Sequence, residues 1–187
     1  MKSVRQWIGR GGAAALLAMV ALQLMPVEAV GQQADQARVA AQKAAMQKLA
    51  FLVGTWSGPA TVLRGAMEPL KLTQTEKVEW KLDGLVLEIE GAGANADGRK
   101  LFTALATVAY DDAGKAYHIR AYHDGQYLDT ELTVKDGGFA WGFAAGPVHV
   151  DNTMHLTPTG EWYETTEFVM GNASPRRSME MTLTRQP

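Results

Sequence analysis

The sequence contains no cysteine, which excludes a disulfide framework and a thiol for lipid attachment. No apolar run reaches the roughly 20 residues that a membrane-spanning helix requires. An excess of basic residues is also missing, because 18 Lys and Arg stand against 20 Asp and Glu. A protein that binds nucleic acid needs a basic surface to displace counterions. We therefore expect no nucleic-acid partner and no stable membrane insertion of the mature chain.

Residues 1–29 have the pattern of a secretory signal peptide. Lys2, Arg5 and Arg10 precede an apolar stretch of about 13 residues that ends at Met25. The small-residue pattern that signal peptidases cleave then follows, ending at Ala29. Cleavage there would leave 15 basic and 19 acidic residues, after loss of those three cations and one glutamate. The sequence thus predicts an exported, acidic protein, either periplasmic or secreted.

Residues 30–53 are predicted to form an N-terminal helical segment. From Gln32 to about Leu52 the chain is rich in Ala, Gln and Lys, with neither Gly nor Pro, which favours a helix. One apolar face follows helical spacing and comprises Met46, Leu49, Ala50 and Val53. Gly54 is expected to end the helix.

From residue 54 to 187 the period changes to that of β-structure. Runs of Val, Ile, Leu, Thr and aromatic residues are interrupted about every ten residues by turn sequences such as Asp83-Gly84 and Asp124-Gly125. The pattern predicts about ten strands, at about 55–64, 71–82, 85–91, 100–110, 116–123, 126–135, 139–144, 148–156, 161–171 and 176–185.

These strands predict an all-β domain, a single antiparallel up-and-down β-barrel preceded by the N-terminal helix. No helical stretch between them is long enough for a parallel crossover, so neighbours must pair as hairpins. A meander of this length closes into a barrel because closure removes exposed edges. The strand at 100–110 is apolar on both faces, and we expect the N-terminal helix to cover it outside.

The sequence resembles a known superfamily at the start of its first strand. A Gly-x-Trp at this place, here Gly54-Thr55-Trp56, is typical of the calycins, which include the lipocalins and fatty-acid-binding proteins. The wider chain, from about Leu49 to Arg185, resembles an exported bacterial calycin-like family, domain-of-unknown-function family 1579. The matching pieces are Val53-Gly54-Thr55-Trp56-Ser57-Gly58, Leu82-Asp83-Gly84, Tyr110-Asp111, and Met179-Glu180-Met181-Thr182-Leu183-Thr184-Arg185. The resemblance implies a fold and no specific function.

A second resemblance concerns the nitrobindins, ten-stranded barrels that also open on Gly-Thr-Trp and hold ferric haem. That resemblance would imply a proximal histidine in the last strand. This chain has Arg177-Ser178-Met179-Glu180-Met181 there, with no histidine. Met179 or Met181 could supply a thioether, but methionines on an alternating strand usually fill a core. We therefore expect no haem and no other cofactor.

The histidines do not predict a metal site. His149 and His155 share a strand face but lie six residues apart, roughly 20 Å along an extended chain. His118 and His123 have opposite parity and so point to opposite faces. No sequence pattern of nucleophilic catalysis is present, which leaves enzymatic activity open but unsupported.

The candidate cavity residues come from polar side chains that share a face with apolar ones. Glu76 shares the parity of Trp80 in its strand, so it either faces the lumen or emerges at the rim. A buried carboxylate needs a cation, and Arg120 is the candidate partner, with Tyr122 on the same face. Aromatic residues of adjacent strands could line a cavity or fill a core. The predicted ligand-binding set is Trp56, Glu76, Trp80, Arg120, Tyr122, Trp141 and Trp162.

Three functions are compatible with this sequence. The first is a barrel that binds a small, partly apolar ligand in a cavity. The second is a packed barrel that acts as an interaction module of the cell envelope. The third is an enzyme that uses Glu76 with Arg120 or His118 as general acid and base. A cavity of a few hundred cubic ångströms would favour the first. The oligomeric state stays open.

Overall fold

The structure, a computed structural model, describes residues 27–187 and is a closed barrel of ten antiparallel strands with one N-terminal helix. The helical elements are α1 (Val27–Met46), η1 (Gln47–Leu52) and the short η2 (Leu82–Gly84). The strands are β1 (Gly54–Arg64), β2 (Met67–Lys81), β3 (Val86–Ala94), β4 (Lys100–Asp111), β5 (Ala116–His123), β6 (Gln126–Lys135), β7 (Gly138–Ala145), β8 (Val148–Leu156), β9 (Trp162–Met170) and β10 (Arg176–Arg185). The predicted fold class is confirmed.

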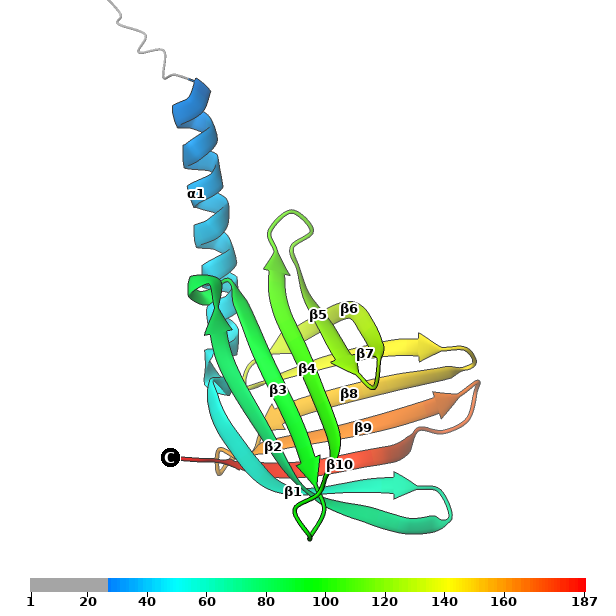
Figure 1. Cartoon of the computed structure of the whole chain (residues 1–187). Helices are drawn as coiled ribbons and strands as arrows, with labels where there is room; N and C mark the ends of the chain where they lie inside the picture. Colours follow the sequence, from blue (N-terminus) through cyan, green and yellow to red (C-terminus); the bar gives the residue numbers. More distant parts are fainter. Residues whose placement is uncertain (1–26) are drawn as a thin grey trace, which may run out of the picture.

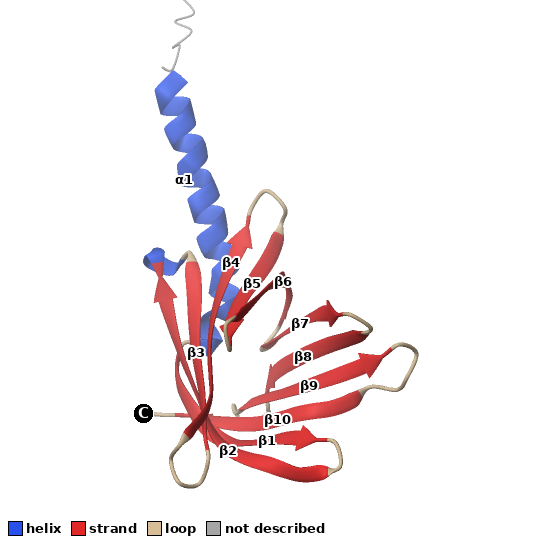
Figure 2. Ribbon diagram, turned by 45° about the vertical axis from the view of Figure 1, so that its right-hand side comes forward, coloured by secondary structure: helices blue, strands red, loops and turns tan. Residues whose placement is uncertain are grey.

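Each strand pairs with its neighbour in sequence, and β1 pairs with β10 to close the barrel (Figures 1 and 2). Turn sequences explain the hairpins: Asp83 and Asp124 adopt positive φ, and each is followed by a glycine that also does. Along the strands, one parity is buried and the other is exposed, as in β3, where Leu87 and Ile89 face the core.

One end of the barrel is closed by η1 together with Trp56. Met46, Leu49 and Leu52 are fully buried there. Their spacing of three matches the three residues per turn of a 3₁₀ helix. The prediction of a continuous α-helical face was therefore wrong at Ala50, which is exposed because the last six residues form η1.

Helix α1 is attached to the barrel only by its C-terminal part. The Tyr117 hydroxyl donates to the Ala45 carbonyl over 2.7 Å, and the Gln42 amide donates to the Leu85 carbonyl over 3.2 Å. The rest of α1 projects away from the barrel (Figure 1). It contacts β4, but Leu105 on the outer face of that strand lines an open surface concavity, so α1 does not cover the whole strand as expected. None of the helices within residues 27–187 combines the length and apolarity needed to cross a bilayer.

The paired ladder between β6 and β7 is the shortest in the barrel. These strands pair only from Leu132 to Lys135 on β6, opposite Gly138 to Trp141 on β7. Beyond that ladder the β5–β6 hairpin diverges from the β7–β8 hairpin (Figure 2). There the Thr130 hydroxyl donates a hydrogen bond of 2.9 Å to the Gly142 carbonyl, so a side chain links the two strands. The barrel wall therefore has no continuous backbone ladder at this place.

Candidate functional site: the barrel cavity

The barrel is hollow, with an interior cavity of about 620 Å³. Small side chains on four strands leave this space: Ala60 on β1, Gly91 on β3, Ala104 and Ala106 on β4, and Ala121 on β5. The opposite wall carries large ones. There Phe139, Trp141 and Phe143 on β7 line the cavity together with Trp162 on β9, and the rings of Trp141 and Phe143 stack at 6.1 Å.

Glu76 lies on β2, beside Gly91 of β3, with its carboxyl group inside the barrel. It is 8% exposed, and its Oε1 accepts a hydrogen bond of 2.7 Å from the Gln74 amide. A Cβ on Gly91, its neighbour across the β2–β3 ladder, would lie 3.0 Å from both carboxyl oxygens. The glycine therefore makes room for the carboxyl group. Burial raises the pKa of Glu76 to about 7, against the lowering effect of the Gln74 hydrogen bond.

A second carboxyl group, from Glu164 on β9, lines the same cavity. It is also 8% exposed, and its Oε2 accepts a hydrogen bond of 2.8 Å from the indole nitrogen of Trp162. Burial, followed by the charge of Glu76, raises the pKa of Glu164 to about 8. The two carboxyl groups are therefore close enough to influence each other. Both hold protons more tightly than exposed glutamates do.

Two further polar side chains complete the polar part of the cavity. The Thr166 hydroxyl donates to the Asn152 carbonyl oxygen over 2.7 Å, and both residues line the cavity. Asn152 is 6% exposed. An apolar cavity with a few convergent polar groups is the usual architecture of a small-molecule site.

Arg120 does not pair with Glu76. Its side chain lies on the outer face and is half exposed, and its Nε donates to the Asp129 carboxylate over 2.9 Å. The parity that places Ile119 in the core turns Arg120 outward. The expected Glu76–Arg120 ion pair was therefore wrong, because Glu76 shares the interior with a second acid instead of a cation.

The predicted cavity residues fall into three groups. Glu76, Trp141 and Trp162 line the cavity. Trp56 and Trp80 pack in or against the core beyond it, and Arg120 and Tyr122 lie on the outer face. Contact of any of these residues with a ligand stays a prediction.

Trp56 closes the barrel end. Its indole nitrogen donates to the Leu52 carbonyl over 2.7 Å, and the Arg185 guanidinium lies 4.2 Å from its ring centroid. Arg185 also donates to the carbonyl oxygens of Phe51 and Val53, which fastens η1 to β10. Trp56 therefore has a structural role at the closed end.

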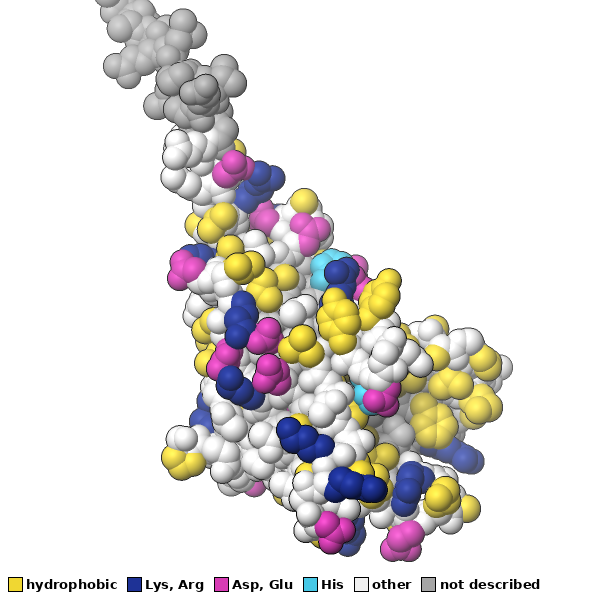
Figure 3. Space-filling model, viewed as in Figure 1, with side chains coloured by type: hydrophobic (Ala, Val, Ile, Leu, Met, Phe, Trp, Pro, Cys, Tyr) yellow, Lys and Arg dark blue, Asp and Glu magenta, His cyan; other side chains and the backbone are white. Residues whose placement is uncertain are grey.

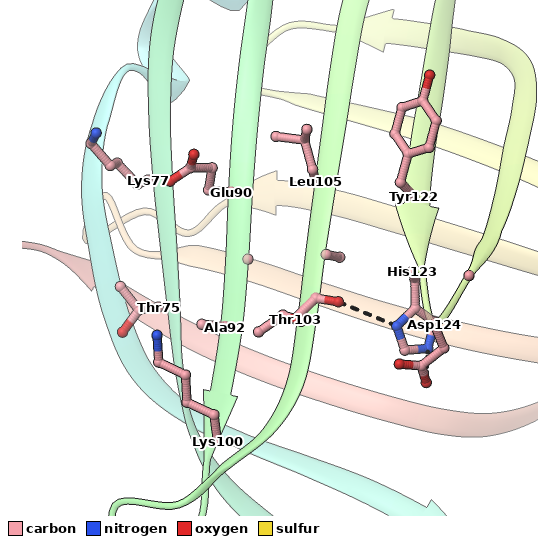
Figure 4. A pocket seen from close by; sticks show the side chains of 13 residues that line it. Thr75, Lys77, Glu90, Ala92, Lys100, Thr103, Leu105, Tyr122, His123 and Asp124 are labelled. Carbon is pink, nitrogen blue, oxygen red and sulfur yellow. Dashed lines mark hydrogen bonds and ion pairs between the residues drawn. The ribbon is translucent and has the colours of Figure 1, made fainter.

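A second concavity, of about 580 Å³, lies on the outer face of β2 to β5 (Figure 4). Lys77, Lys100 and Tyr122 line it, and the His123 ring lies against the Thr103 carbonyl at 3.3 Å. Lys77 pairs with Glu79, and basic and acidic side chains are mixed over the face in Figure 3. This surface shows no excess of one charge that would select a charged partner.

Two histidines each lie beside one carboxylate: His149 Nε2 is 3.1 Å from Asp151 Oδ1, and His123 Nε2 is 3.2 Å from Asp124 Oδ2. No group of three or more His, Asp and Glu side chains within the described residues is arranged to hold a metal ion. His149 and His155 are exposed on β8, as the alternation predicted, and His123 lies at the cavity margin with Asp124.

Sequence reasoning missed Glu164 and Asn152. Glu164 shares the parity of Trp162, and this was the signal that could have found it. Asn152 shares the parity of Met154 on β8 in the same way. Both were hidden because β8 and β9 carry polar residues on both faces.

Comparison with known proteins shows the fold alone. No protein-family model matches the chain, and no curated protein is similar to it in sequence. Among solved structures, the crystal structure of Rv2717c from M. tuberculosis is similar, with a TM-score of 0.58 and 15% sequence identity. The similarity covers 76% of this chain and 98% of that chain. The barrel architecture is thus shared with a solved structure.

Proposed function

We propose that this protein binds a small, partly apolar molecule inside its barrel, in the periplasm or outside the cell. The main support for this proposal is the cavity, because its volume of about 620 Å³ lies in the usual range of ligand sites. Its aromatic wall offers an apolar surface, and Glu76, Glu164 and Asn152 offer polar contacts. A barrel that served only as a packed interaction module would have no reason to leave this space.

We further propose that the chain belongs to the calycin-like family that its sequence resembles. Support comes from Gly54-Thr55-Trp56 at the start of β1 and from the Arg185 guanidinium stacked on Trp56. These features form the closed end of the barrel. Family membership would make a ligand-binding role the natural expectation, but the site carries that argument.

An enzyme is the second candidate, because one observation favours it. Two buried carboxyl groups with raised pKa values face one cavity, an arrangement that can donate and accept protons near neutral pH. Arg120 has no part in such a mechanism, since it lies outside. Incubation of the protein with its identified ligand would distinguish catalysis from binding, because an enzyme would release the ligand in chemically altered form.

We also propose that haem is not the occupant of this cavity. On β10, the last strand, Met179 and Met181 line the cavity, and neither is the histidine that the nitrobindin resemblance implies. We propose that the natural occupant is an organic molecule other than haem.

Native mass spectrometry of mature protein purified from its own cell envelope tests the proposal. We expect an additional mass that is lost on denaturation, and an absorbance spectrum without a Soret band. The mass of the denatured chain also identifies the mature N-terminus, which we expect at Val30. A Soret band would contradict the exclusion of haem. A chain that still carried residues 1–29 would contradict export with cleavage.

Filling the cavity should abolish binding. Ala106→Phe places a ring in the lumen, because Ala106 lines the cavity. Ala92→Phe, on the outer side of the neighbouring strand, is the matched control. We expect Ala106→Phe to be purified without the additional mass, while Ala92→Phe retains it. Retention of the same ligand by both variants would place the binding site elsewhere.

A further inference from the structure

The two buried carboxyl groups of the cavity each have an oxygen without a protein partner. Glu76 uses Oε1 for Gln74, and Glu164 uses Oε2 for Trp162. Among the described residues, no hydrogen bond or ion pair involves Glu76 Oε2 or Glu164 Oε1. Since no fully buried side-chain oxygen in this part of the chain lacks a partner, these two oxygens must reach the open cavity. Both side chains are more than nine-tenths buried and line the same empty space. Their free oxygens are therefore available to a molecule within the cavity.

The cavity wall supplies no counter-charge to these acids. Among the described residues, those that line the cavity include neither Lys nor Arg. The other ionisable groups in the wall are His123 and Asp124, which lie at the margin at the end of β5. Burying two acids without a cation is costly for a fold, so a site that keeps them has an electrostatic preference for a positive occupant.

We propose that the ligand is an amine whose ammonium group lies between Glu76 and Glu164, with its apolar body against the aromatic wall of β7. This inference rests on the proposed function and specifies the ligand class. An ammonium group has three N–H donors, so a single one can donate to two carboxyl oxygens at once. Charge-assisted hydrogen bonds of this kind are stronger than neutral ones. Phe139, Trp141 and Phe143 provide the apolar contact.

The proposal predicts a particular pH dependence. Burial holds protons on both acids near neutral pH, and an ammonium ion must displace them to form its ion pairs. Amine affinity should therefore rise as the pH rises from about 5.5 to about 8.5, until the amine itself loses its proton. The side chains that hydrogen-bond to the pair, Gln74 from β2 and Trp162 from β9, do not titrate in this range. The ionisable side chains that share the cavity wall with the pair are His123 and Asp124, at its margin.

Three dansyl probes with one body and different ends test this. Dansylcadaverine ends in a primary amine, N-pentyl dansylamide is neutral, and N-dansyl-6-aminohexanoic acid ends in a carboxylate. Dansyl fluorescence rises in an apolar site, so titration gives a dissociation constant for each probe. At alkaline pH we expect the dissociation constant of dansylcadaverine to be at least about tenfold lower than that of the neutral probe. The carboxylate probe should bind weakest.

Variants assign the preference to the acids. Glu76→Gln and Glu164→Gln keep the side-chain shape and remove the charge, and each should bring dansylcadaverine close to the neutral probe. Glu131→Gln is the matched control, because Glu131 is exposed on the outer face of β6. It should leave the preference unchanged. Should either interior variant fail to fold, the pH profile of the wild-type protein still tests the proposal.

The outcomes separate the two levels of the proposal. Failure of all three probes to bind would count against the cavity as a site for ligands of this size. Equal binding of the neutral and amine probes would overturn the amine inference while leaving a ligand-binding barrel. Tighter binding of the carboxylate probe at low pH would show that the acids act as protonated hydrogen-bond donors, which also overturns it.

Discussion

At the scale of single residues, the position of the Glu76 carboxyl group depends on a glycine on the neighbouring strand. Gly91 has no Cβ, and this absence gives the Glu76 carboxyl group its place against β3. Gly93 is similar, since a Cβ there would lie 2.8 Å from the Gln74 Oε1 atom. The polar part of the cavity is thus built from glutamate and glutamine on β2 and from glycine on β3.

Gly91→Ala should displace the Glu76 carboxyl group, because the added methyl would lie 3.0 Å from both oxygens. We expect dansylcadaverine binding to weaken by about tenfold, while binding of the neutral probe changes little. Ala92→Val adds volume on the outer side of the same strand and should have neither effect. An unchanged amine preference in Gly91→Ala would mean that the carboxyl group adapts without loss.

Residue parity predicted the interior only in part. The parity that Glu76 shares with Leu72, Val78 and Trp80 left two positions open, the lumen or the rim, and the structure places Glu76 in the lumen. The inference then required a cation, and Arg120 was chosen although its neighbour Ile119 is the buried one. Parity with Trp162 could place Glu164 inward, but it could not show that this acid, from a strand far along the chain, lines the same cavity as Glu76. Such long-range pairing depends on barrel closure, which the sequence predicts only in outline.

At the scale of elements, the strands follow closely from alternation and turn residues. The predicted bounds of β5, β6, β8 and β10 agree with the structure, since Gly and Asp mark most of the turns beside them. The helical segment was less predictable. Its last six residues tighten into η1 because Met46, Leu49 and Leu52 all reach the core in that conformation. Local propensity alone does not distinguish an α-helix from a 3₁₀ helix in such a stretch.

Because η1 closes the barrel end, its core residues should contribute strongly to stability. Leu49→Ala removes a fully buried side chain and should lower the free energy of unfolding by about 2–5 kcal/mol. Lys48→Ala, at an exposed neighbouring position, should change it by less than about 0.5 kcal/mol. Urea titration followed by tryptophan fluorescence measures both. Similar midpoints for the two variants would show that η1 is not part of the cooperative unit.

At the scale of the whole molecule, the hollow interior could not be predicted from the strand pattern. Whether a barrel is filled depends on the summed volume of all inward side chains. Here alanine and glycine on β1, β3, β4 and β5 lie opposite aromatic residues on β7 and β9. The sequence shows these residues but not which of them lie opposite each other. Of the candidate aromatic residues, Trp141 and Trp162 therefore line the cavity, whereas Tyr122 lies on the outer face.

The interior acids should also make the stability of the entire barrel depend on pH. In the unfolded chain both groups ionise near the ordinary value of 4.5, whereas burial raises the pKa of Glu76 to about 7 and of Glu164 to about 8. Between these values the native state holds more protons than the unfolded state, so stability must fall as pH rises. At about 1.4 kcal/mol per pKa unit, Glu76 alone should account for roughly 3 kcal/mol.

Urea titrations of ligand-free protein between about pH 4.5 and about pH 9 measure this slope. Glu76→Gln and Glu164→Gln should each flatten it and raise stability at the alkaline end, since neither amide has a charge to bury. Glu131→Gln should retain the wild-type slope because that side chain is exposed. A saturating amine should also flatten the wild-type profile, since it supplies the missing positive charge. A wild-type profile that is flat or rises over this range would mean that the acids ionise as freely in the barrel as in the unfolded chain, and that water reaches them.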